Sequence, residues 1–246
     1  AVACVLGLVQ AASLPVMVRF YHHETEAEWA FAARAIRDLR RAGHAVSAAL
    51  VQDRRAVLNP GRWAGFVARV VDDLADTLDG VEVGHAINRV KWGVWTFAEF
   101  RRLLEPAAEA ARRHPELKFM GPAVIDFEYP FLVAALSALP RGFRFHALSH
   151  HLYVDRRGAP ENRQGRFDTE KKIVLGRAIA EVSPGCEPRF VISETNWPLR
   201  GTGVYSPVGS PYVMPGPRRV DPSVSEAEYG DFMIRYLVIA LASGLV

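Results

Sequence analysis

Residues 190–199 read Phe-Val-Ile-Ser-Glu-Thr-Asn-Trp-Pro-Leu, and this stretch decides how we interpret the rest of the chain. Its first three residues form a short apolar run typical of a buried strand, and Glu194 follows just after the run ends. Pro198 then stops strand pairing. In a parallel barrel the loops at the carboxyl ends of the strands hold the chemistry, so Glu194 is a candidate catalytic group. A salt-bridged or capping glutamate is the alternative.

The composition is that of one globular unit. The chain has 246 residues, half of them hydrophobic, and no composition shift divides it, so we expect a single domain over residues 1–246. The net charge of +3 comes from scattered arginines instead of a basic face, which argues against nucleic acid as a partner. Cys4 and Cys186 form no metal-spaced cluster, and a reducing, cytoplasmic compartment is the default expectation.

The first twelve residues form an uncharged, largely apolar run. They lack the basic segment of a signal peptide and are too short to span a bilayer. We interpret them as the end of a helix whose beginning, with the strand before it, is missing. No other segment approaches transmembrane length, so the sequence predicts a soluble protein without a membrane partner.

Six strand-like runs alternate with helical patterns along the chain. The runs end at residues 21, 51, 84, 125, 149 and 192. Capping-box pairs predict the starts of three helices, at Thr25 with Glu28, Thr96 with Glu99 and Ser225 with Glu228. Regular alternation indicates a parallel sheet, either a closed barrel or an open doubly wound sheet. No Gly-x-Gly-x-x-Gly turn follows the first strand and polar residues recur at every strand end, which favours the barrel.

A full barrel has eight strands, and the sequence supplies six. Residues 244–246 resemble the start of a further strand. We therefore predict an incomplete (β/α)8 TIM barrel with strands two to seven and their helices, without strand one and most of strand eight. Its first and last strands then have unpaired edges. Residues 200–222, rich in Gly and Pro, form the longest irregular stretch, which is typical of a functional lid or a disordered loop.

In this strand numbering, the strand that ends at Gly84 is the fourth and the one before Glu194 is the seventh. The chain thereby resembles clan A of the retaining glycoside hydrolases, the 4/7 superfamily, which has an acid/base Glu after strand four and a nucleophilic Glu after strand seven. Residues 191–198 match the strand-seven motif, and the resemblance gives Glu194 the nucleophile role. Residues 81–88, Val-Glu-Val-Gly-His-Ala-Ile-Asn, match strand four in outline, but Ala86 stands where the acid/base Glu is expected and His85 where an Asn is expected.

The alanine at this position matters because retaining hydrolysis needs two carboxyl groups about 5–5.5 Å apart, and Ala86 cannot transfer a proton. In a first interpretation, Asp126 or Glu128, at the end of the neighbouring strand, supplies the acid. Glu128 is the better candidate because Tyr129 helps to desolvate it, which favours its protonated form. A loop carboxylate paired with an arginine is the alternative for Glu128.

Two other interpretations remain open. In one, the barrel binds carbohydrate without cleaving it. In the other, His85 or His150 carries the proton, because imidazole titrates in the useful range.

Further residues at the strand ends suit a sugar site. Indole rings stack on sugar faces, and asparagine both donates and accepts hydrogen bonds, as hydroxyl recognition requires. Arg19 is expected to orient Glu194 and to keep it negatively charged. The other expected contacts are His85, Asn88, Trp92, His150, Tyr153, Asn196 and Trp197.

A metal-dependent barrel hydrolase is a rival class, prompted by the pairs His22-His23 and His150-His151. Adjacent histidines on a strand point to opposite faces, so each pair offers at most one inward ligand, and no His-Glu-x-x-His pattern occurs. We therefore expect no metal and no organic cofactor, and a carbohydrate as the partner.

Overall fold

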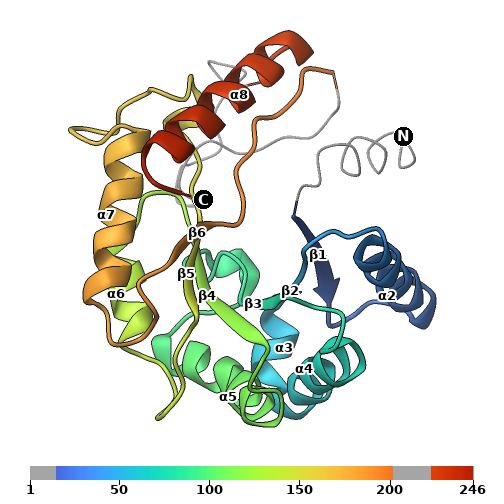
Figure 1. Cartoon of the computed structure of the whole chain (residues 1–246). Coiled ribbons are helices and arrows are strands. Elements are labelled where there is room, and N and C mark those ends of the chain that lie inside the picture. The colour runs from blue at the N-terminus through green and yellow to red at the C-terminus, as the bar shows by residue number, and fades with distance from the viewer. Residues whose placement is uncertain (1–14, 202–222, 246) are drawn as a thin grey trace.

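Six parallel strands form one sheet in the computed structural model, which describes residues 15–201 and 223–245 (Figure 1). Their spatial order follows the chain: β1 (Val16–Tyr21), β2 (Val46–Val51), β3 (Gly80–Val83), β4 (Lys118–Ile125), β5 (Ala147–His151) and β6 (Phe190–Ile192). The predicted partial (β/α)8 barrel is confirmed. The sheet is not closed, since β1 and β6 pair only with β2 and β5 among the described strands.

Helices connect successive strands and lie around the outside of the sheet (Figure 1). They are α2 (Glu26–Arg41), α3 (Arg54–Leu58), α4 (Pro60–Leu74), α5 (Phe97–Arg113), α6 (Tyr129–Leu136), α7 (Thr169–Val182) and α8 (Glu226–Ala242). The three predicted capping boxes are all formed, at the starts of α2, α5 and α8. In each, the cap hydroxyl and the glutamate three residues later satisfy backbone N–H groups that the first turn leaves unpaired.

The two faces of the sheet differ in polarity. On β3, Val81 and Val83 belong to the hydrophobic core between sheet and helices. Because successive side chains of a strand alternate between its faces, Glu82 points to the interior of the barrel. The same alternation on β5 places Leu148 in the core and directs Ser149 inward. The barrel interior is therefore lined with polar groups.

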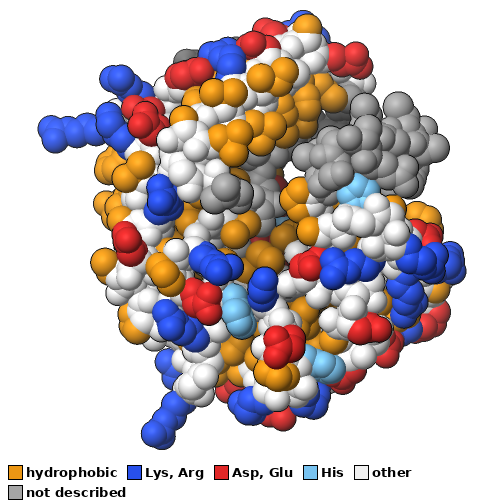
Figure 2. Space-filling model, in the orientation of Figure 1, with side chains coloured by type: hydrophobic (Ala, Val, Ile, Leu, Met, Phe, Trp, Pro, Cys, Tyr) orange, Lys and Arg blue, Asp and Glu red, His pale blue; other side chains and the backbone are white. Residues whose placement is uncertain are grey.

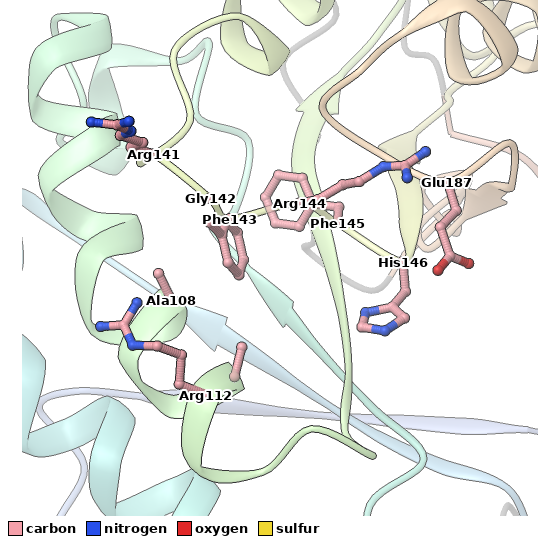
Figure 3. Close-up of a pocket in the computed structure, with 10 residues that line it drawn as sticks. Ala108, Arg112, Arg141, Gly142, Phe143, Arg144, Phe145, His146 and Glu187 are labelled. Carbon is pink, nitrogen blue, oxygen red and sulfur yellow. The ribbon is translucent and has the colours of Figure 1, made fainter.

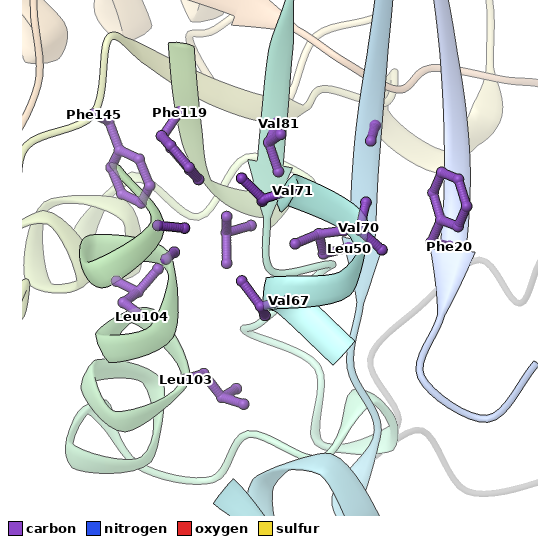
Figure 4. Packing of buried hydrophobic residues seen from close by; sticks show 14 of the residues in the cluster. Phe20, Leu50, Val67, Val70, Val71, Val81, Leu103, Leu104, Phe119 and Phe145 are labelled. Atoms are coloured by element: carbon purple, nitrogen blue, oxygen red, sulfur yellow. The ribbon is translucent and has the colours of Figure 1, made fainter. Parts of the chain in front are cut away.

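The apolar outer face packs tightly against α4 and α5 (Figure 4). Val67, Val70 and Val71 recur at helical spacing on α4 and are fully buried in this core. Leu103 and Leu104 of α5 extend the same cluster toward Phe119 of β4 and Phe145. Burying each such side chain stabilises the fold by roughly 1.5–3 kcal/mol, which fixes the sheet on which the candidate site is built.

Several boundaries differ from the predictions. Helix α3 was not predicted, and the helix from Pro60 ends at Leu74 instead of near residue 80. Gly244 and Leu245 close α8 by a hydrogen bond from the Leu245 amide to the Ala240 carbonyl, so these two residues do not start a strand. The predictions for residues 1–12 and for most of residues 200–222 lie outside the described residues.

Helix α8 has apolar residues on two sides. Tyr236 and Ala240 are buried. Figure 2 shows hydrophobic side chains gathered over this helix, and its exposed apolar residues are Ile234, Leu237, Val238 and Leu241. Among the helices that the structure describes, including α8, we find none with the length and apolar character needed to cross a membrane.

Candidate active site

Glu194, which follows β6, is contacted by side chains from two other strands. Arg19 of β1 donates a hydrogen bond to its Oε2, and the hydroxyl of Tyr153, which follows β5, donates to its Oε1. The Glu194 side chain is only 17% exposed. Since β1 and β6 are the two edges of the sheet, the Arg19 contact requires the sheet to curve until its edges face each other.

His151 lies between Glu194 and a second, buried carboxylate. Its Nδ1 is 4.0 Å from Glu194 Oε2, and its Nε2 is 3.4 Å from Glu82 Oε1. Burial of Glu82, whose side chain is 1% exposed, by itself raises its pKa. The hydrogen bond and charge of His151, together with hydrogen bonds from Ser193 and Ser149, outweigh burial, and the pKa is lowered. Glu82 was not predicted as a site residue, and of the pair His150-His151 the prediction favoured His150.

His85 lies beside this group, directly after β3. Its backbone amide and carbonyl pair with the side-chain amide of Gln52. Its ring centroid is 4.8 Å from that of His151 and 4.3 Å from that of Trp92. Burial lowers the pKa of His85 to about 2, so the ring is neutral at physiological pH. His85 therefore lies in one group with His151 and Glu194, and Trp92 packs against His85.

The two predicted acids, Asp126 and Glu128, share one guanidinium. Arg89 donates to Asp126 Oδ2 at 2.7 Å and to Glu128 Oε1 at 2.6 Å. Asn88 donates from Nδ2 to Glu128 Oε2 at 2.8 Å. This is the arginine-paired arrangement named as the alternative for Glu128.

Asn88 and His150, two of the expected sugar contacts, make hydrogen bonds within the protein. The Asn88 amide also binds both backbone groups of Ile125, so it joins the β3 loop to the end of β4. His150 points to the outer face of the sheet, where its Nε2 contacts the backbone oxygen of Asp126 at 2.6 Å. Burial lowers the pKa of His150 to about 4. The structure therefore directs His151, and not His150, toward Glu194.

Trp197 is a core residue, which differs from the expectation of a sugar platform. It is 2% exposed and packs against Tyr229, Phe232 and Tyr236 of α8. Its Nε1 donates to the carbonyl of Gly158 at 2.9 Å. The neighbouring Asn196 is exposed, and its Oδ1 accepts from the Trp197 amide.

Among the residues that the structure describes, two groups of side chains have the composition of metal ligands: His22 with His23 and Asp53, and His85 with His151 and Glu194. Within each group the ligand atoms lie within 4.8 Å of one another. The expectation that the pair at 22–23 offers one ligand at most is wrong, because β1 ends at Tyr21 and the strict alternation of a strand ends with it.

A cavity of about 440 Å³ lies at the opposite end of the barrel (Figure 3). It is formed by residues 141–146, before β5, with Ala108 and Arg112 near the end of α5 and Glu187 before β6. Conserved chemistry in barrels of this type sits at the carboxyl ends of the strands, so we do not assign the active site to this cavity.

Solved structures of glycosidases share this architecture. The Ignisphaera aggregans GH53 catalytic domain superposes with a TM-score of 0.62 over 96% of this chain and 72% of its own, at 13% identity. The fold is a partial (β/α)8 barrel. The β-glycosidase BGL167 matches the same barrel with a TM-score of 0.59 over 98% of this chain and 72% of its own, at 12% identity.

A third glycosidase barrel with the same architecture is the exo-β-1,4-mannosidase Op5Man5 from Opitutaceae bacterium strain TAV5. Its TM-score is 0.56 over 93% of this chain and 44% of its own, at 16% identity. No protein-family model matches the chain, and no curated protein matches it significantly in sequence. At these identities the likeness establishes the (β/α)8 barrel fold alone, and the reaction has to be argued from the side chains.

Proposed function

We propose that the protein acts on O-glycosidic bonds of a carbohydrate, with Glu194 as the nucleophile that attacks the anomeric carbon. The observation that carries the proposal is the carboxylate of Glu194 at the carboxyl end of β6, held by Arg19 on one oxygen and by Tyr153 on the other. The glycosidase barrels with similar folds support the same reaction class.

The two hydrogen bonds prepare Glu194 for attack. A carboxylate bound at both oxygens is held in one orientation, so less freedom is lost when the sugar arrives. The guanidinium of Arg19 stabilises its negative charge. The proposal therefore assigns the attacking group to Glu194 and the positioning roles to Arg19 and Tyr153.

We propose Glu128 as the group that protonates the leaving oxygen. Its side chain is half exposed after β4, the neighbour of β3, and a substrate can reach it there. Glu82 is sealed inside the barrel, where a substrate has no access. Glu128 has to exchange its bonds with Arg89 and Asn88 for the glycosidic oxygen, so acid catalysis is expected to be inefficient.

If protonation of the leaving oxygen is inefficient, kcat/KM should depend steeply on the acidity of the leaving group. Aryl glycosides whose phenols are strong acids leave without a proton and should be hydrolysed, whereas alkyl glycosides should react about 10²–10⁴-fold more slowly than with a well-placed acid. The measurement is kcat/KM across a series of substituted phenyl glycosides. A flat profile would contradict the assignment, because it indicates full proton transfer.

The role of Glu128 itself is tested by Glu128→Ala. We expect kcat/KM to fall for substrates with poor leaving groups and to change little for activated ones. The turnover of activated substrates should still fall, because hydrolysis of the glycosyl intermediate loses its general base, and azide as an external nucleophile should restore part of that turnover. Asp126→Asn is the matched control because Asp126 binds the same Arg89. Equal rates in the wild-type protein and in Glu128→Ala would remove Glu128 from the acid role.

A second candidate function is carbohydrate binding without cleavage. It is favoured by Ala86, a buried alanine in the stretch that resembles the strand-four motif. A panel of aryl glycosides separates the two functions, since measurable affinity for a sugar without release of the phenol supports binding alone.

A further inference from the structure

Unpaired polar atoms gather inside the barrel next to Glu194. Among the described residues, the buried atoms without a hydrogen-bond partner include His85 Nδ1 and His151 Nδ1. The hydroxyls of Ser149 and Ser193 lie beside the neighbouring Glu82 and stabilise its charged form. Buried polar atoms are nearly always paired, so a group of them in one place points to a bound polar species.

The residues present suit a transition-metal ion. His85, His151 and Glu194 each offer one ligand atom, and the three atoms lie within 4.8 Å of one another. Two imidazoles with one carboxylate are typical of zinc and other first-row divalent ions, whereas calcium and magnesium prefer oxygen ligands throughout.

The surroundings of His151 favour the same interpretation. Its Nε2 faces the carboxylate of Glu82, which leaves its Nδ1 directed toward Glu194. A histidine that binds a metal through one nitrogen usually donates from the other to a carboxylate or carbonyl, which fixes its orientation. Glu82 thereby acquires a role as the partner that orients His151.

We propose that His85, His151 and Glu194 bind a divalent first-row transition ion, for which Zn²⁺ is the probe. The binding itself is independent of the proposed function. Its consequence, inhibition of turnover by occupation of the nucleophile, rests on the proposed function. The ion and the sugar then compete for the carboxylate of Glu194.

The positive charge of Arg19 weakens binding of a cation by Glu194, because Arg19 contacts Oε2 of the same carboxylate. The Arg19 side chain is 42% exposed, so it has room to turn toward solvent when the ion binds. Removing it should therefore tighten Zn²⁺ binding, although the same change should slow turnover by releasing the nucleophile.

The group of His22, His23 and Asp53 is the internal control. His22 Nε2 already contacts Asp53 Oδ1 at 2.6 Å, and this oxygen also caps α3 by accepting from the Ala56 amide. The other oxygen of Asp53 is 3.6 Å from Arg55 Nε. Among the described residues, the buried atom without a partner in this group is His22 Nδ1 alone, whereas His85 Nδ1 and His151 Nδ1 both lack one, so we assign the ion to the barrel interior.

The test is isothermal titration of Zn²⁺ into chelator-stripped protein, repeated with Co²⁺ and monitored by visible absorption. We expect one ion per chain, loss of binding in His85→Ala and Glu194→Gln, and about 10–100-fold weaker binding in Glu82→Gln. Arg19→Met should bind more tightly, and His23→Ala should bind as the wild-type protein does. Thermal unfolding of each variant confirms that it is folded.

Three results would overturn the proposal: no binding by the wild-type protein, unchanged binding in folded Glu194→Gln and His85→Ala, or loss of binding in His23→Ala. None of them bears on the proposed function, which is measured on chelator-stripped protein with an aryl glycoside. Addition of Zn²⁺ should then lower the rate, and a higher rate would contradict the competition between ion and sugar.

Discussion

Replacement of Glu194 by glutamine is expected to lower kcat for an activated aryl glycoside by at least about 10⁴-fold, as loss of a catalytic nucleophile does in other enzymes. Glutamine has nearly the same size and keeps an oxygen that accepts one hydrogen bond from Arg19 or Tyr153. It cannot attack the anomeric carbon, so no glycosyl intermediate forms. The measurement is release of the phenol, with thermal unfolding to confirm that the variant is folded.

Glu187→Gln is the matched control. Glu187 precedes β6 and Glu194 follows it, so the two glutamates flank the same strand at opposite ends. Its partner Arg189 lies outside the site, 3.7 Å from its carboxylate. We expect wild-type turnover in Glu187→Gln, because chemistry in these barrels lies at the carboxyl ends of strands. Equal activity in Glu194→Gln and the wild-type protein would exclude Glu194 as the nucleophile.

The substitution Trp197→Ala is expected to lower the free energy of unfolding by about 3–5 kcal/mol, the usual cost of removing a buried tryptophan. It removes the ring on which α8 packs and leaves the Gly158 carbonyl without its donor. Trp197→Phe retains most of the packing, so it should lower the free energy of unfolding less, by about 1–3 kcal/mol. This loss comes mainly from the unpaired Gly158 carbonyl. Urea denaturation of the three proteins gives these values.

Trp95→Ala is the control for Trp197. Trp95 is 62% exposed and stacks under the Arg54 guanidinium, 3.8 Å from the ring centroid. Loss of this contact should lower the free energy of unfolding by at most about 1 kcal/mol. If Trp197→Ala instead weakened sugar binding and left the free energy of unfolding unchanged, Trp197 would be the sugar platform and not a core residue.

The strand and helix pattern was predictable because its causes are local. The capping boxes lie within four residues of the chain, and the apolar runs follow the periods of strand and helix. Regular alternation then requires a parallel sheet. The position of Glu194 at a strand end followed from the same reasoning, and Arg19 contacts its carboxylate.

The side-chain partners were harder to predict because they depend on where each strand ends. The fifth strand was expected to end at residue 149, and it runs to His151. That extension fixes His150 on the outer face and His151 on the inner face, since neighbouring side chains of a strand point to opposite sides. Glu82 was missed because its partner, His151, lies on β5, and the residues around Glu82 in the sequence do not indicate that partner.

The sequence by itself determined the class of fold, the order of its elements and the carboxylate at the end of β6. Tertiary structure alone decided that Arg89 holds Asp126 and Glu128, that Trp197 supports α8, and that Glu82 and His151 lie under Glu194. The physical reason is that helix and strand formation depends on neighbours along the chain. Burial and ion pairing depend on groups that are far apart in the sequence. Arg19 and Glu194 are 175 positions apart and meet only because the sheet curves.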